Sequence, residues 1–157
     1  MTPLGVLTVA ATGAWLGIMA FFSFVAAPIL FRTLERGVAG DAAASVLPGY
    51  YVCGLVLGAV ALLTLVLRVV AREPRWRWNV LGAVVTAVML GLVLWSLAVV
   101  LPAAQAARGA RDSTGFSVVH RRAVTLNALM MLGGLVVIGL EAISRPGTRP
   151  SASPRAP

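Results

Sequence analysis

Hydrophobic residues fill four long stretches of the chain in which no side chain is charged. These stretches cover residues 1–31, 42–67, 78–107 and 123–140. A helix needs about 20 mostly apolar residues to cross a bilayer, and three of the stretches exceed that length. The fourth reaches it when its flanking residues are included. The pattern therefore predicts a polytopic membrane protein of the all-α class, built as a four-transmembrane-helix bundle.

The ends of these stretches give approximate bounds for the predicted helices. We expect the helices at about residues 4–31, 47–70, 79–101 and 118–143. They form one transmembrane domain over residues 1–145, and the Pro-, Ser- and Arg-rich segment 146–157 is expected to be a disordered tail. The first stretch lacks the preceding basic region of a secretory signal, so we expect it to be retained as the first helix.

The links between the predicted helices differ in length and character. The link over residues 71–78 is short and forces the second and third helices into an antiparallel hairpin. The link over residues 32–46 contains an Ala run and is expected to hold a partial helix at the membrane interface. The link over residues 102–117 is polar.

The charge of the chain agrees with a membrane environment. Hydrophobic residues make up 59% of the chain and charged residues 11%; the net charge is +8, and all 13 basic residues are arginine. Because these arginines flank apolar stretches, they are typical of membrane anchoring and argue against nucleic acid as a partner. The expected partners are a lipid bilayer with anionic headgroups, a small solute, and a second copy of the chain or a partner membrane protein.

The distribution of arginine also bears on orientation. Four spans place both termini and the 71–78 link on one side of the membrane, with seven arginines against six on the other side. That difference is small, but arginine is densest in the short link. We therefore expect the N- and C-termini to be cytoplasmic, with the protein in a bacterial cell membrane.

Small residues four apart predict where helices approach each other closely. Gly13 and Gly17 form such a pair in the first helix, and Gly54 and Gly58 form one in the second. We expect both pairs to pack within the chain, with a dimer face as the alternative. The single cysteine, Cys53, is expected to be a small buried packing residue.

Two further features concern packing and symmetry. Trp15 and Trp95 are expected to pack inside the bundle, and Pro28 to kink the first helix. A weak internal repeat could mark a duplicated helical hairpin with a pseudo-two-fold axis along the membrane normal, and chance in a biased composition is the alternative. In this repeat Ser23, Pro28, Arg36-Gly37 and Asp41 recur as Ser96, Pro102, Arg108-Gly109 and Asp112.

Polar residues of the fourth helix are candidates for function. His120 and Asn127 lie seven residues apart, and therefore about 20° apart around the helix. Polar groups at membrane depth usually face the bundle interior. His120 could bind a metal or haem, carry a proton or act as a hydrogen-bonding latch, or it could simply be satisfied by backbone or water. Asn127 fits an interhelical hydrogen bond better than a ligand contact.

Charged residues suggest two further hypotheses. Arg121 beside Arg32 would form a cationic mouth that faces an anion, and snorkelling to headgroups is the alternative. The ligand-binding hypothesis therefore comprises His120, Asn127, Arg32 and Arg121. Glu141 lies four residues before Arg145, so an i,i+4 salt bridge is expected, with a proton-carrying carboxylate as the alternative.

The sequence offers little support for enzymatic chemistry. With one histidine and five acidic residues, no Ser-His-acid set can be assembled and no catalytic residue is assigned. A haem held by two histidines of one chain is excluded, although a dimer could share His120. The metal and the cofactor remain unspecified.

Two blocks of residues resemble the transmembrane protein 205-like family, a small membrane domain of otherwise unknown function. The first block comprises Gly13-Ala14-Trp15, Phe24-Val25, Leu30-Phe31-Arg32, Leu34, Leu47-Pro48 and Tyr50-Tyr51. The second comprises Phe116, His120, Asn127 and Glu141, and Pro102 is also similar. The sequence departs from the family pattern after His120, where Ala123 and Val124 replace a Ser-rich patch, and in its short link before the fourth helix.

The resemblance implies a four-helix membrane bundle. Animal relatives are associated with resistance to platinum drugs, which suggests export or sequestration of small molecules or metal complexes. Our first hypothesis is that the bundle binds or moves a small solute or metal complex. The alternatives are a structural or accessory subunit that binds partner helices and an intramembrane redox protein.

Overall fold

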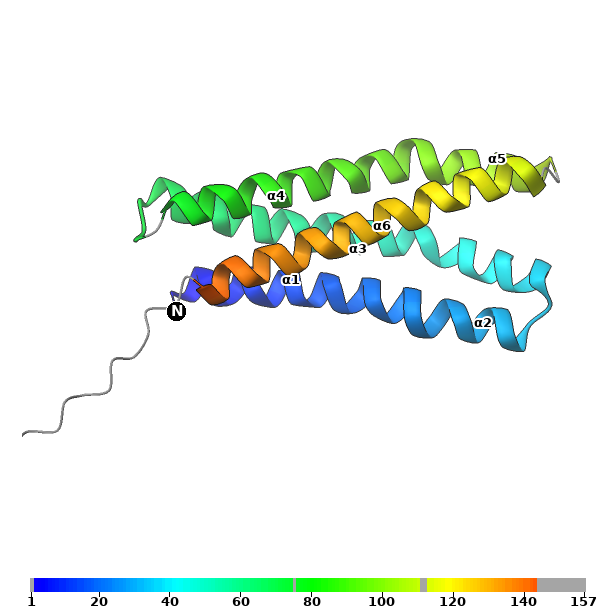
Figure 1. Ribbon diagram of the computed structural model, residues 1–157, viewed down its shortest axis with the longest axis horizontal. Coiled ribbons are helices and arrows are strands. Elements are labelled where there is room, and N and C mark those ends of the chain that lie inside the picture. Colours follow the sequence, from blue (N-terminus) through cyan, green and yellow to red (C-terminus); the bar gives the residue numbers. More distant parts are fainter. Residues whose placement is uncertain (1, 75, 111–112, 144–157) are drawn as a thin grey trace, which may run out of the picture.

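The computed structural model describes residues 2–74, 76–110 and 113–143, and these residues form an all-helical bundle (Figure 1). Its elements are α1 (Pro3–Phe21), η1 (Phe22–Ala26), α2 (Ala27–Thr33), α3 (Arg36–Val70), α4 (Trp76–Trp95), η2 (Ser96–Val100), α5 (Leu101–Gly109) and α6 (Ser113–Ile143). The described part of the chain contains four helical rods that are long and apolar enough to cross a membrane. The predicted fold class is therefore confirmed. The predicted tail lies outside the described residues.

The four rods are α1–η1–α2, α3, α4–η2–α5 and α6, and each packs against two others. Both α3 and α6 contact α1 and α4, so α3 and α6 are diagonal across the bundle. The start of α1, the α3–α4 link and the end of α6 lie at one end, here called the amino-terminal end (Figure 1). The α2–α3 and α5–α6 links lie at the opposite, far end.

The helices extend beyond the predicted bounds at the far end. The second helix begins at Arg36 rather than near residue 47 and carries Pro48 inside it. The link before the fourth helix is largely helical as well, because α5 runs to Gly109 and α6 begins at Ser113. The 35 residues of α3 span about 52 Å, whereas the hydrocarbon core is about 30 Å thick. Hydropathy marks where a helix leaves lipid, and Ala-rich segments such as residues 39–44 continue the helix outside it.

Two of the rods contain a π-helical segment just before a proline. Proline has no N–H and cannot close the usual bond to the carbonyl four residues earlier. In η1 the N–H of Ala27 bonds the carbonyl of Phe22, and in η2 the N–H of Leu101 bonds that of Ser96, five residues earlier in each case. The two π segments and the prolines that follow them, Pro28 and Pro102, are related by the same displacement along the chain. Because each π segment follows from its proline, the duplicated hairpin stays a prediction.

The core contains bulky residues from all four rods. Its buried members are Trp15, Met19, Tyr51, Met89, Val93, Leu101 and Met130. Trp15 is buried as expected, but Trp95 is 58% exposed and Cys53 is exposed, so those two expectations are wrong. The exposed surface of the spans faces lipid, which is as apolar as the core. Hydrophobic character alone therefore does not decide which side of a helix is buried.

The two glycine pairs behave differently. A Cβ atom on Gly54 would lie 2.9 Å from Nε1 of Trp15, and one on Gly58 would lie 2.7 Å from Cδ2 of Leu90. These glycines therefore create the space that the Trp15 ring fills. Gly13 and Gly17 have no atom within 4 Å of the equivalent position, so the close packing expected of them inside the bundle is wrong. The indole of Trp15, rather than the glycine edge of α1, makes the close contact with α3.

Candidate functional site: polar clusters inside the bundle

Polar side chains are buried along the bundle interior at several levels. Burying a polar group at membrane depth is costly unless the group is paired, so such residues are candidates for function. Those buried among the described residues are Thr8, Thr12, Thr64, Arg68, Asn79, Thr86, Ser96 and Glu141. Together with half-buried neighbours they contribute to two clusters that connect the diagonal helices α3 and α6.

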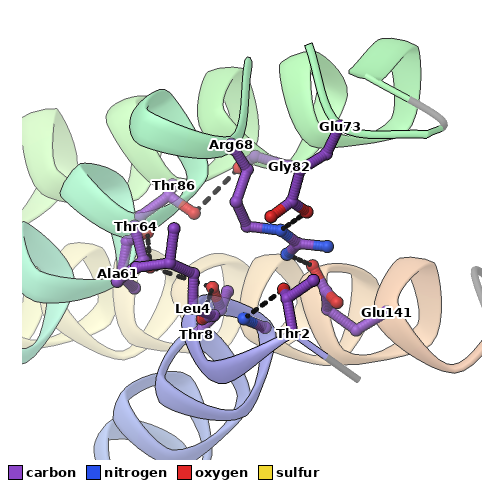
Figure 2. Close-up of polar contacts among 11 residues, drawn as sticks. Thr2, Leu4, Thr8, Ala61, Thr64, Arg68, Glu73, Gly82, Thr86 and Glu141 are labelled. Atoms are coloured by element: carbon purple, nitrogen blue, oxygen red, sulfur yellow. Dashed lines mark hydrogen bonds and ion pairs between the residues drawn. The ribbon is translucent and has the colours of Figure 1, made fainter. Parts of the chain in front are cut away.

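The first cluster consists of Arg68, Glu73 and Glu141 and is called here the Arg68 cluster. Figure 2 shows the Arg68 guanidinium between the two carboxylates. Its Nε donates to Oε2 of Glu73 at 2.9 Å, and its NH1 donates to Oε1 of Glu141 at 2.5 Å. Arg68 is only 7% exposed and Glu141 only 8%. One buried cation therefore holds two carboxylates, which leaves an excess of negative charge when both are ionised.

Three elements bring the Arg68 cluster together at the amino-terminal end. Arg68 lies in the last turn of α3, and Glu141 lies in the last turn of α6. Glu73 is placed by the α3–α4 link, where its N–H bonds the carbonyl of Arg68 at 3.1 Å after a left-handed residue, Arg72, with φ of 48°. The guanidinium also reaches α1, because a Cβ on Gly5 would lie 3.7 Å from its Cζ.

The structure gives Glu141 a partner that the sequence does not predict. Glu141 bonds Arg68 on the diagonal helix. The expected salt bridge with Arg145 stays a prediction, because Arg145 lies outside the described residues. Local spacing cannot reveal the pair of Glu141 with Arg68, because the fold brings together residues that are far apart in the chain.

Hydroxyl groups continue the polar interior beside the Arg68 cluster. The hydroxyls of Thr8 and Thr64 lie 2.9 Å apart and join α1 to α3 (Figure 2). Among the described residues, two buried side-chain atoms have no hydrogen-bond partner, Oγ1 of Thr12 and Nδ2 of Asn79. An unpaired buried polar atom costs about 1–3 kcal/mol. Such atoms mark positions where a water molecule or a polar solute would be stabilised.

The second cluster surrounds Asn127 and is called here the Asn127 cluster. The hydroxyl of Tyr50 donates to Oδ1 of Asn127, and Nδ2 of Asn127 donates to Oγ of Ser23 at 2.9 Å. The same Nδ2 lies 3.8 Å from the sulfur of Met131. The amide thus ties α6 to both α3 and η1, which agrees with interhelical bonding as its structural role.

Removal of the Asn127 amide is expected to weaken the bundle measurably. Asn127→Leu leaves the Tyr50 hydroxyl and the Ser23 hydroxyl without their shared partner, at a cost of about 1–3 kcal/mol in the free energy of unfolding. The measurement is reversible unfolding in detergent, combined with Tyr50→Phe in a double-mutant cycle. A coupling of about 1 kcal/mol is expected. Strictly additive effects would show that the two side chains do not interact.

The remaining predicted site residues lie near the far end. His120 is exposed, and its ring stacks on Phe116 with centroids 5.9 Å apart. Phe116 in turn lies 5.9 Å from Cζ of Arg108, which donates to the carbonyl of Gly40 at 2.6 Å and pairs with Asp41. These contacts join α5 to the start of α3.

The cationic mouth proposed from the sequence stays a prediction. Arg32 is exposed at the end of α2, and Arg121 is exposed on α6. The ion pairs of the described residues involve Arg68 and Arg108 and neither of these two arginines. The described residues also contain no group of three or more His, Cys, Asp or Glu that could hold a metal ion.

The sequence does not identify Arg68, Tyr50 or Arg108 as residues whose polar contacts join the helices. Arg68 carried a usable signal, because it is a charged residue within the predicted helix over residues 47–70. Tyr50 appeared only as part of a family resemblance. Arg108 lies in a segment that the sequence predicts to be a polar link, where an arginine needs no special explanation.

The comparisons place this multi-pass membrane protein among proteins of unestablished activity. A family model described as a domain of unknown function, DUF4149, matches residues 10–113, which is more than half of the chain. The chain therefore belongs to the DUF4149 family. The matched region includes Tyr50, Arg68 and Arg108 and ends at the start of α6, before Asn127 and Glu141.

A relative from Aquifex aeolicus (strain VF5), described as an uncharacterized protein, is 41% identical over 56 residues. This match covers 36% of the chain and 42% of the relative, so the chain spans less than half of that protein's length. No solved structure matches the chain.

Proposed function

We propose that the bundle binds and moves a small polar solute, and that Arg68 is the group that engages it. The observation that carries this proposal is the buried guanidinium shared by Glu73 and Glu141. An ionisable residue inside a membrane bundle is expensive and is usually part of a solute or proton pathway. The Asn127 cluster gives a second polar level, about 21 Å from Glu141 along α6.

The donor set of Arg68 favours an oxyanion or a carboxylate as the solute. Guanidinium N–H groups bind planar carboxylates and phosphate-like groups through paired hydrogen bonds. Protonation of Glu141 would remove its charge and weaken its bond to Arg68, which would free NH1 for the solute. In this scheme Glu141 is the proton-carrying carboxylate, and release of its proton expels the solute from Arg68.

The resemblance to the transmembrane protein 205-like family supports the binding of a small solute, and membership of that family is part of the proposal. The association of animal relatives with platinum resistance favours export or sequestration of small molecules or metal complexes. His120, Arg32 and Arg121 then belong to an entrance at the far end, with Asn127 deeper in the bundle.

Native mass spectrometry of gently extracted protein tests where the solute binds. Wild type is expected to carry a discrete extra mass that Arg68→Gln/Glu141→Gln loses. This double variant removes the guanidinium without leaving Glu141 unpaired. Arg77→Gln is the matched control, since Arg77 is an exposed arginine at the same end, and it should retain the mass. A wild-type protein with no extra mass would contradict binding. Loss of the mass in His120→Ala alone would show that the solute binds at the far end instead.

We propose that both termini face the cytoplasm of a bacterial cell. The arginines of the α3–α4 link and of the start of α4 support this orientation. In a Cys53→Ser background, a membrane-impermeant maleimide added to intact cells is expected to label Glu35→Cys at the far end and to spare Arg77→Cys. The reverse labelling pattern would invert the topology.

A structural or accessory role is the second candidate, and the exposed edge of α1 favours it. Gly13 and Gly17 leave open space beside them, so a partner helix or a second copy could approach α1 closely. Gly17→Leu is then expected to preserve the fold and to abolish a specific crosslinked complex. If the crosslinked complex persists in Gly17→Leu, the open edge of α1 is not the contact with the partner, and the structural role loses its support.

A further inference from the structure

A lateral groove on the outside of the bundle lies between the α4–η2–α5 rod and α6. It encloses about 460 Å³, and its wall includes Trp95, Val99, Ala103, Arg121, Arg122 and Leu126. The groove follows the π segment η2, where the backbone departs from α-helical bonding ahead of Pro102. It is separate from the polar clusters of the interior, because none of its wall residues belongs to either cluster.

The two ends of this groove differ in chemistry. Arg121 and Arg122 lie on the part of α6 that is nearer the far end, whereas Trp95 lies deeper in the membrane at the end of α4. The α4–η2–α5 wall from Ala103 to Trp95 extends about 12 Å along the rod. The groove therefore has a cationic outer end and an apolar inner part.

The two arginines are available to an external anion. Both are exposed, and within residues 2–74, 76–110 and 113–143 no carboxylate forms an ion pair with either of them. Arg108 at the same end is different, because Asp41 and the carbonyl of Gly40 occupy its guanidinium. Two adjacent cations above a largely apolar groove fit an anionic lipid headgroup between transmembrane helices.

We propose that this groove is a binding site for one anionic phospholipid of the leaflet at the far end. The lipid phosphate contacts Arg121 and Arg122, and one acyl chain lies along Val99 and Leu126 towards Trp95. A free inorganic anion would contact the arginines but would leave the apolar wall formed by Trp95, Val99 and Leu126 uncovered. The groove thus selects a lipid by charge and by its chain together.

Native mass spectrometry of delipidated full-length protein, titrated with phosphatidylglycerol or phosphatidylcholine, tests the site. Wild type is expected to retain one phosphatidylglycerol in preference to phosphatidylcholine. Arg121→Gln/Arg122→Gln should bind phosphatidylglycerol about 30-fold more weakly. Arg32→Gln/Arg36→Gln removes the same charge from exposed positions at the same end but outside the groove, so it should bind as wild type does.

Ala103→Trp separates binding in the groove from attraction to surface charge. It fills the groove and keeps both arginines, and it should also lose the bound phosphatidylglycerol. Each variant is first required to show the wild-type elution profile and unfolding temperature. Retention of the lipid by Ala103→Trp, an equal loss in Arg32→Gln/Arg36→Gln, or displacement of the lipid by millimolar inorganic phosphate would each overturn the proposal.

Discussion

Replacement of Arg68 by methionine is expected to destabilise the bundle by about 3–5 kcal/mol. The substitution keeps much of the apolar stem but removes the only cation that pairs with the buried carboxylate of Glu141 among the described residues. Glu141 would then be left as an unpaired buried charge or be forced to take up a proton. The measurement is the free energy of unfolding in detergent, from a denaturant or SDS titration monitored by tryptophan fluorescence.

Removal of all three charges provides the matched control. A buried ion pair contributes little net stability when it is compared with well-packed apolar residues, because desolvation offsets the attraction. Arg68→Met/Glu73→Gln/Glu141→Leu is therefore expected to recover most of the stability that Arg68→Met loses. If Arg68→Met alone is as stable as wild type, the ion pairs of the Arg68 cluster do not exist in the folded protein.

Substitution of leucine for Gly58 is expected to be comparably damaging, for a steric rather than an electrostatic reason. A Cβ at this position would lie 2.7 Å from Cδ2 of Leu90 and 2.8 Å from Cζ3 of Trp15. Both neighbours belong to the packed core or its margin, so the helices α1, α3 and α4 would have to separate. Overpacking of this kind costs about 1–3 kcal/mol, and leucine adds more than one methylene.

Gly17→Leu is the control for that steric argument. Gly17 lies in an equally apolar helix and has a partner glycine at the same spacing, but no atom lies within 4 Å of its Cβ position. The thermal unfolding temperature of Gly17→Leu should therefore match wild type while that of Gly58→Leu falls. Equal effects of the two substitutions would mean that the α1–α3 contact around Trp15 is placed incorrectly.

The arrangement into four spans could be predicted from the sequence because lipid imposes a simple requirement. Every backbone polar group in the hydrocarbon must be paired within its own segment, so uncharged stretches of sufficient length become helices. Helix ends follow a different rule. Residues 36–46 and the first turn of α6, which begins at Ser113, are helical beyond the predicted apolar spans, where hydropathy carries no information about backbone bonding.

Burial inside the bundle could be predicted only in part. Trp95 and Cys53 face outward although both are apolar, because lipid receives such side chains as readily as the core does. Asn127 could be found because an amide within an apolar helix requires a partner. Its actual partners, Tyr50 and Ser23, lie on other rods, and only the packing of those rods brings them to the amide.

The π segments η1 and η2 also change how faces are assigned along the two rods that contain them. In each π segment the backbone N–H bonds the carbonyl five residues earlier, whereas in an α-helix it bonds the carbonyl four residues earlier. The segment therefore holds about one extra residue, and one residue turns a helix by about 100°. Residues before Phe22 and after Ala26 are therefore out of phase on a helical wheel, and the same holds across Ser96–Val100. Deletion of a single residue within either segment would restore an unbroken α-helical phase and rotate everything beyond it, including Arg32 in the first rod and Arg108 in the third, to another side of the protein.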